Sequence, residues 1–269
     1  MVSARVVLVA LLCLVPTAAV AHGPNEHPAD PNLHTLPGLK DCSVAFAPEL
    51  TQETFAQFVR EFGSVSAFKT SLPTTLGRHG YALGLQQFYF TVEEKSATWN
   101  DTFAHPDSYH ELGSSHAFPK LTLSYGVTDK LDVGAFYTVN AEANYGWFGL
   151  DAEYGLLRQD ESSPVSLAIR GAYTKTLFVD DMDMHALSAD VSAGRTFWEV
   201  LTPYLGLGGD LVFARETSSN VDLQAELQLV PRALGGLELR LGYVSIGAEA
   251  HVSEITSYQV HLAMAHPGH

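Results

Sequence analysis

The sequence is poor in cysteine, in basic residues and in long apolar runs, and each shortage excludes a class of protein. Its 269 residues include two cysteines, Cys13 and Cys42. Cys13 lies in the apolar leader described below, so the mature chain is expected to have no internal disulfide. Lys and Arg number 15 against 30 Asp and Glu, which gives a net charge of −15. This balance argues against a nucleic-acid partner, because phosphate binding needs basic patches.

The one apolar run of note lies at the start of the chain. Arg5 precedes an apolar stretch at 6–15, and Ala19-Val20-Ala21 has the small-x-small pattern of a cleavage site. We therefore predict that residues 1–21 are a secretory signal peptide, cleaved after Ala21. Beyond it, no stretch approaches the ~20 continuous apolar residues of a transmembrane helix. The motifs G-x-S-x-G, H-E-x-x-H and C-x-x-C are also missing, so no catalytic residue is predicted.

A short segment at 22–76 precedes the main body of the chain. Its first part, rich in His and Pro, is interpreted as a solvated tail. A helix is predicted at 51–62, with Thr51 as N-cap and Gly63 as the stop signal. One face of this helix is apolar and carries Phe55, Phe58, Val59 and Phe62. It needs an apolar surface to cover it, which is a barrel mouth, a lumen or a partner protein.

Most of the remaining chain alternates between apolar and polar residues. In 221–230, V-D-L-Q-A-E-L-Q-L-V, the odd positions from Val221 to Leu229 are apolar and the even positions carry acids and amides. A strand with this pattern has two unlike faces. The apolar face points inward in a soluble sandwich and toward lipid in a membrane barrel, whose lumen is then polar.

Ten runs of this kind follow one another, each near the ~9–11 residues of a tilted transmembrane strand. The second, fourth, sixth and eighth runs end in compact turns, near Thr128, Asp160, Phe197 and Ala233–Gly235. Most of the other connections are longer or more acidic. A change of phase at Gln86-Gln87 predicts a β-bulge. The runs lie at 81–92, 121–125, 131–139, 145–156, 165–174, 185–195, 205–213, 221–230, 237–243 and 258–264.

The run L-T-L-S-Y-G-V-T-D-K-L-D-V-G-A-F-Y at 121–137 resembles the hairpins of Gram-negative outer-membrane β-barrel proteins, and the resemblance covers 77–266. It implies an up-and-down antiparallel transmembrane β-barrel of about ten strands, with eight or twelve as alternatives. It also implies short periplasmic turns, a periplasmic segment at 22–76 and a tail at 267–269. The implied partners are outer-membrane lipid, lipopolysaccharide and the barrel-assembly machinery. One departure is the ending M-A-H-P-G-H, where family members usually end their last strand on an aromatic residue.

The polar positions of the runs are assigned to the lumen. We expect Arg170 to pair with Asp151 or Glu153, and Arg240 with Glu226, while Lys120 and His261 also face inward. The acids outnumber the bases, and the surplus requires water, protons or cations. A narrow cation-preferring channel or cation-binding barrel is one hypothesis, and a closed structural or adhesive barrel is the other. The predicted lumen residues are Asp132, Asp151, Glu153, Arg170, Asp190, Asp210, Asp222, Glu226, Glu238 and Arg240.

The predicted loops opposite the compact turns combine imidazole and carboxylate groups. His105, His110, Glu111 and His116 could hold a divalent cation such as zinc, which is the only cofactor considered. The alternatives are solvated loops bridged through divalent ions to lipopolysaccharide, or a rim-sited hydrolase in which a His–acid pair activates water. The other polar loop residues are Asp180, Asp181, Asp183, His185, Glu249, His251 and Glu254.

Overall fold

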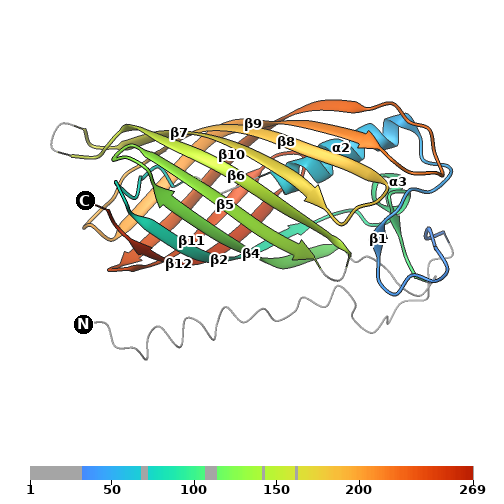
Figure 1. Ribbon diagram of the computed structural model, residues 1–269, viewed down its shortest axis with the longest axis horizontal. Helices are drawn as coiled ribbons and strands as arrows, with labels where there is room; N and C mark the ends of the chain where they lie inside the picture. Colours follow the sequence, from blue (N-terminus) through green and yellow to red (C-terminus); the bar gives the residue numbers. More distant parts are fainter. Residues whose placement is uncertain (1–31, 68–71, 107–113, 141–142, 161–162, 269) are drawn as a thin grey trace.

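The computed structural model describes residues 32–67, 72–106, 114–140, 143–160 and 163–268. Within these ranges, ten antiparallel strands close into one barrel (Figure 1). Each barrel strand pairs with the next, and the last pairs with the first. This confirms the predicted up-and-down barrel of about ten strands. The strands are β2 (Tyr81–Thr91), β4 (Ser115–Gly126), β5 (Leu131–Asn140), β6 (Tyr145–Leu157), β7 (Ser166–Leu177), β8 (Met182–Gly194), β9 (Leu201–Glu216), β10 (Glu226–Leu241), β11 (Val244–Val252) and β12 (Ser257–His266).

The outer face of the barrel is a belt of exposed apolar side chains. Leu205, Leu207 and Leu229 are 64%, 67% and 74% exposed, and outward-facing residues of the other strands repeat the pattern. Soluble monomers rarely expose such a continuous apolar surface. In lipid, backbone N–H and C=O groups must be hydrogen-bonded within the protein. A closed barrel meets this need because its strands leave no open edge, and its apolar exterior suits contact with hydrocarbon. The structure therefore resolves the two-faced strand pattern in favour of a transmembrane barrel.

Two strand boundaries differ from the prediction. Residues 226–230 and 237–241, from two predicted runs, belong to one strand, β10, so the predicted turn at Ala233–Gly235 is wrong. The missing strand is β11, which lies in a stretch predicted to be a connection. The two errors cancel in the strand count. Outward apolar residues keep one phase from Leu227 to Leu241, which is what a single strand requires.

The predicted β-bulge in β2 is also wrong. β2 pairs with β4 and with β12 without a change of register at Gln86-Gln87. The phase of the apolar residues changes because Phe88 and Phe90 point into the barrel, while Tyr81 and Leu83 point outward. Inward aromatic residues at one end of a strand indicate that something apolar fills the lumen there.

That filling comes from the segment before β2. α2 (Gln52–Ser66) begins as predicted, with the Thr51 hydroxyl oxygen accepting a hydrogen bond from the Thr54 N–H. It continues past the predicted stop at Gly63, which instead packs against Val212 of the barrel wall. Across the described ranges, no helix is long and apolar enough to span a bilayer. The remaining elements are β1 (Ser43–Val44), α3 (Ala97–Asn100) and β3 (Phe103–Ala104), and β1 pairs with β3.

The two mouths of the barrel differ. The turn end carries the connections 127–130, 158–165, 195–200 and 242–243, and Gly268 near the C-terminus lies there. The loop end carries the connections 92–114, 141–144, 178–181, 217–225 and 253–256. In Figure 1, α2 lies inside the barrel toward the loop end, and β1 and α3 lie beyond it, opposite the C-terminus. Residues 32–66 therefore lie toward the opposite end of the barrel from the short turns, and the predicted periplasmic position of 22–76 stays a prediction.

Candidate functional site in the barrel lumen

Aromatic side chains close the lumen at the loop end. The ring centroid of Phe62 on α2 lies 5.3 Å from that of Tyr145 and 5.6 Å from that of Trp147, both on β6. Phe58 packs edge-on against Trp99 of α3 at 5.5 Å. All five side chains are fully or almost fully buried. The apolar face predicted for the helix is therefore covered by the barrel's own inner wall, and we call this cluster the aromatic plug.

Below the aromatic plug, four charged side chains form a ladder across β7 to β10. The Arg170 Nη2 atom donates to Asp190 Oδ2 at 2.7 Å. Arg232 donates from Nη1 to both carboxylate oxygens of Asp210, at 2.8 and 2.9 Å, and from Nη2 to Asp190. These side chains are at most 3% exposed. The two arginines balance the charges of the two aspartates. This balance stabilises the ladder, since a buried carboxylate is costly unless it is paired.

One glycine makes this charged ladder possible. Asp190 on β8 and Arg232 on β10 are both aligned with Gly208 on β9, the strand between them. A Cβ atom at position 208 would lie 2.4 Å from Asp190 Oδ1. Because Gly208 has no side chain, Asp190 and Arg232 can meet across the strand that lies between them. A prediction that considers only neighbouring strands does not find such a pair.

Two further polar groups lie on β10 to β12. Glu249 accepts a hydrogen bond from Gln259 Nε2 at 2.7 Å and lies against His251 Nε2. Glu238 lies 3.2 Å from His261 Nε2. Glu249 and His251 are thus lumen residues, and their assignment to the loops was wrong because β11 was not recognised. Their burial removes them from the rim on which a hydrolase site was considered.

A small acidic chamber occupies the turn end of the lumen. Asp132, Asp151 and Glu153 line a cavity of about 130 Å³, together with Leu72 and Thr74 of the segment before β2. Glu238, Arg240 and His261 line the same cavity. Asp132 Oδ2 accepts a hydrogen bond from a backbone N–H of this segment. Asp151 and Glu153 make no direct ion pair or hydrogen bond within the described part of the chain, although Glu153 is only 9% exposed.

The ten predicted lumen residues occupy different positions. Asp222 is exposed in the 217–225 connection and does not face the lumen. Glu226 lies at the loop-end mouth beside Gln52, and Arg240 at the turn end, half-exposed and 3.7 Å from Glu238. The expected Arg240–Glu226 pair is wrong, because both residues are on β10. Arg170 pairs with Asp190 instead of Asp151 or Glu153. The residues buried inside the lumen are Asp132, Asp151, Glu153, Arg170, Asp190, Asp210 and Glu238, and the half-exposed Arg240 lines its turn-end chamber.

Two of the four predicted metal ligands, His105 and His116, lie in the described part of the chain. His105 Nδ1 lies 3.3 Å from Cys42 Sγ in the loop-end cap. His116 is on β4, where it stacks on Phe90 with 4.8 Å between ring centroids. His110 and Glu111 lie outside the described residues. Among the residues that are described, no group of three potential ligands is placed to hold a metal ion.

Cys42 is expected to be unreactive in the folded protein. It is fully buried, and burial, with the nearby Asp41 charge adding to it, raises the pKa of its thiol to about 12. At pH 8 the thiolate fraction is then roughly a thousandfold below that of a free cysteine, and the thiolate is the reacting form. Iodoacetamide labelling followed by mass spectrometry should show modification only after unfolding. Rapid labelling of the folded protein at pH 8 would contradict the buried position.

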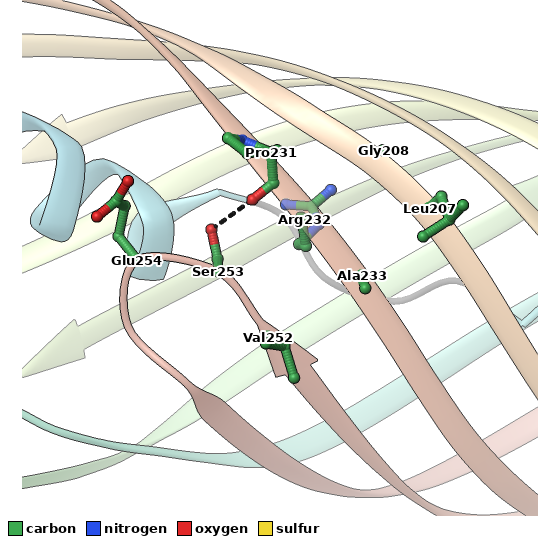
Figure 2. A pocket seen from close by; sticks show the side chains of 8 residues that line it. All are labelled: Leu207, Gly208, Pro231, Arg232, Ala233, Val252, Ser253 and Glu254. Carbon is green, nitrogen blue, oxygen red and sulfur yellow. Dashed lines mark hydrogen bonds between the residues drawn. The ribbon is translucent and has the colours of Figure 1, made fainter.

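A separate hollow of about 600 Å³ lies on the outer face of the wall, where β11 ends beside β10 (Figure 2). Leu207 and Val252 border it, and both point away from the lumen. The Ser253 hydroxyl donates to the Pro231 carbonyl oxygen at 2.9 Å, which satisfies the carbonyl where the pairing with β11 ceases. Gly208 and Arg232 of the charged ladder also line this hollow, so it reaches the lumen site from the outer side of the wall.

No protein-family model and no curated protein matches the chain. Solved structures with a similar fold include an outer-membrane channel from Pseudomonas putida F1, with 8% identity, coverage of 74% of this chain and 100% of that one, and a TM-score of 0.45. The translocator domain of the autotransporter NalP from Neisseria meningitidis has 11% identity, coverage of 76% and 91%, and a TM-score of 0.41. Ail of Yersinia pestis has 10% identity, coverage of 70% and 99%, and a TM-score of 0.34. The chain's own closed ten-strand barrel, with its apolar outer face, has the architecture of outer-membrane β-barrels.

Proposed function

We propose that this protein is a narrow cation-binding passage of the outer membrane, closed at the loop end by the aromatic plug. The acidic chamber carries the proposal. Elsewhere in the lumen each buried acid has a basic or imidazole partner, as in Arg170–Asp190 and Glu249–His251. Asp151 and Glu153 make no direct ion pair within the described part of the chain. Arg170, the base whose charge acts on both, is already paired with Asp190, so the charge of the two acids calls for water, protons or small cations.

Taken together, the charged residues around the two mouths of the barrel also favour cations. The turn end is mixed, with Arg78, Lys130, Arg158 and Arg195 beside Asp129, Asp160 and Glu199. The loop end has Lys40, Arg60, Lys95, Lys175 and Arg215 as its described bases. Its described acids are Asp41, Glu49, Glu53, Glu61, Glu93, Glu94, Asp101, Asp180, Asp181, Asp183, Glu216, Asp222, Glu226 and Glu254. A mouth with an excess of one sign raises the local concentration of counter-ions, so cations are favoured at the loop end.

Current measurements in planar bilayers test this proposal. In a tenfold KCl gradient, the reversal potential of the wild-type barrel should show preference for K⁺. The double variant Asp151→Asn/Glu153→Gln should lose most of that preference, because the surplus charge of the chamber is removed while its volume is kept. Glu254→Gln, which removes an exposed loop-end charge, is the matched control and should keep most of it.

Two results would overturn the proposal. One is a preference for anions in the wild type. The other is the absence of current both in the wild type and in a variant whose aromatic plug has been displaced. A purely structural or adhesive barrel predicts that second result, so the same measurement separates the two functions. The proposal assigns no catalytic residue, and it keeps lipid and lipopolysaccharide as the surroundings of the barrel.

A further inference from the structure

The segment before β2 is anchored at both mouths of the barrel. At the loop end, Phe46 N–H donates to Asp181 Oδ2 at 2.7 Å, and Asn144 Nδ2 donates to the Cys42 carbonyl oxygen at 3.3 Å. These contacts tie 42–46 to the 178–181 and 141–144 connections. The cap built by β1, β3 and α3 lies on the same side, so the chain before α2 belongs to the loop end.

At the turn end, the same segment contacts the opposite set of connections. Thr75 Oγ1 donates to the Asp129 carbonyl oxygen at 3.0 Å, and Leu76 N–H donates to Asp132 Oδ2 at 2.7 Å. The Gly268 N–H donates to the Leu76 carbonyl oxygen at 2.9 Å, which places this part beside the C-terminal residues. Leu72, Thr74 and Leu76 line the acidic chamber, so they lie inside the wall.

The lengths agree with a complete crossing. α2 has 15 residues, and at 1.5 Å per residue it covers about 22 Å. Residues 72–76 add roughly 17 Å if extended at about 3.3 Å per residue. Together these exceed the ~30 Å of the hydrocarbon core. Every barrel strand is hydrogen-bonded to its neighbours on both sides, although β10 pairs with β11 only from Ala233 onward. α2 and residues 72–76 therefore both lie inside the closed wall, one toward the loop end and the other at the turn end.

We infer that the chain crosses the outer membrane once more, inside its own barrel, and that residues 32–50 are displayed on the cell surface. The short turns of outer-membrane barrels face the periplasm and their longer loops face outward. The 92–114 connection, the longest one, shares the loop end with residues 32–50. The N-terminal cap is therefore an extracellular surface, while the C-terminal tail is periplasmic. This conclusion holds whether or not the barrel conducts ions.

Labelling of intact cells with a membrane-impermeant maleimide tests this topology. Glu49→Cys reports on the cap, Ser219→Cys on the loop end and Lys130→Cys on the turn end, and all three positions are exposed. We expect the first two variants to be labelled on intact cells and Lys130→Cys only after the outer membrane is permeabilised. The wild type, whose Cys42 is buried, provides the unlabelled control.

The pattern of labelling decides the matter in every case. If Ser219→Cys is labelled on intact cells but Glu49→Cys only after permeabilisation, the segment does not pass through the lumen. If both need permeabilisation while Lys130→Cys does not, the barrel has the opposite orientation and the cap is periplasmic. Each variant is also labelled in detergent extract, which verifies that its cysteine reacts in the folded protein.

Discussion

Replacement of Arg232 by methionine is expected to lower the free energy of unfolding by about 3–5 kcal/mol, the usual cost of removing one partner from a buried ion pair. Asp210 would lose a bidentate partner and Asp190 one of its two arginines. Both carboxylates would remain buried in the lumen without enough positive charge. Urea unfolding in phospholipid vesicles, followed by tryptophan fluorescence and by the mobility of the folded barrel on gels, measures this loss.

Two variants show whether the charges or the packing are responsible. Arg232→Met combined with Asp210→Leu should recover part of the loss, because a pair of apolar side chains leaves one fewer uncompensated charge. Arg215→Met, at an exposed position near the loop end, should change the unfolding free energy by no more than about 0.5 kcal/mol. If Arg232→Met costs no more than this exposed control, the charged ladder does not stabilise the lumen.

The architecture of the barrel could be predicted because its signal is repeated in every strand. Outward Leu, Tyr and Val residues at alternate positions identify the strands even where each single signal is weak. The boundaries of β10 could not be predicted in the same way, because Pro231, Gly235 and Gly236 usually mark turns. In the barrel, Gly236 instead makes room for Tyr204, whose Cζ would lie 2.4 Å from a Cβ at position 236.

The contents of the lumen could be predicted only in part. The polar phase of each strand identifies most inward side chains, but the pairing of those side chains depends on the stagger between strands. Arg232 was missed because it lies between two predicted runs, next to the predicted turn at Ala233–Gly235. The even-numbered inward phase does continue through it to Glu238, but Val230, Leu234 and Gly236 interrupt its polarity. The position of α2 does have a sequence signal, which is the change of phase that turns Phe88 and Phe90 inward.

Replacement of Gly63 by leucine is expected to displace the aromatic plug and open the loop-end mouth. A Cβ atom at position 63 would lie 2.6 Å from Val212 Cγ2, so no side chain fits there without a shift of α2. Overpacking of this kind costs about 1–3 kcal/mol. If α2 relieves that strain by leaving its packed position in the lumen, the fraction of barrels with an open loop-end mouth rises roughly 5- to 150-fold. This is the population shift that a free-energy change of about 1–3 kcal/mol produces. Planar-bilayer recordings should show longer and more frequent openings than in the wild type.

A reversible disulfide between positions 63 and 212 should have the opposite effect, because it would hold α2 in the lumen. Val212→Cys removes the two methyl groups that a Cβ atom at position 63 would meet most closely. The two Cβ atoms would then lie 3.2 Å apart, slightly below the ~3.5–4.5 Å usual for disulfides, so a small adjustment is enough. Gly63→Cys/Val212→Cys should therefore form a bond that holds α2 in place, with Cys42 too buried to compete. Oxidation should abolish openings and reduction should restore them. The control is Gly171→Leu, where a Cβ meets nothing nearer than 4.0 Å and openings should match the wild type. If oxidised and reduced barrels conduct alike, α2 does not control the passage.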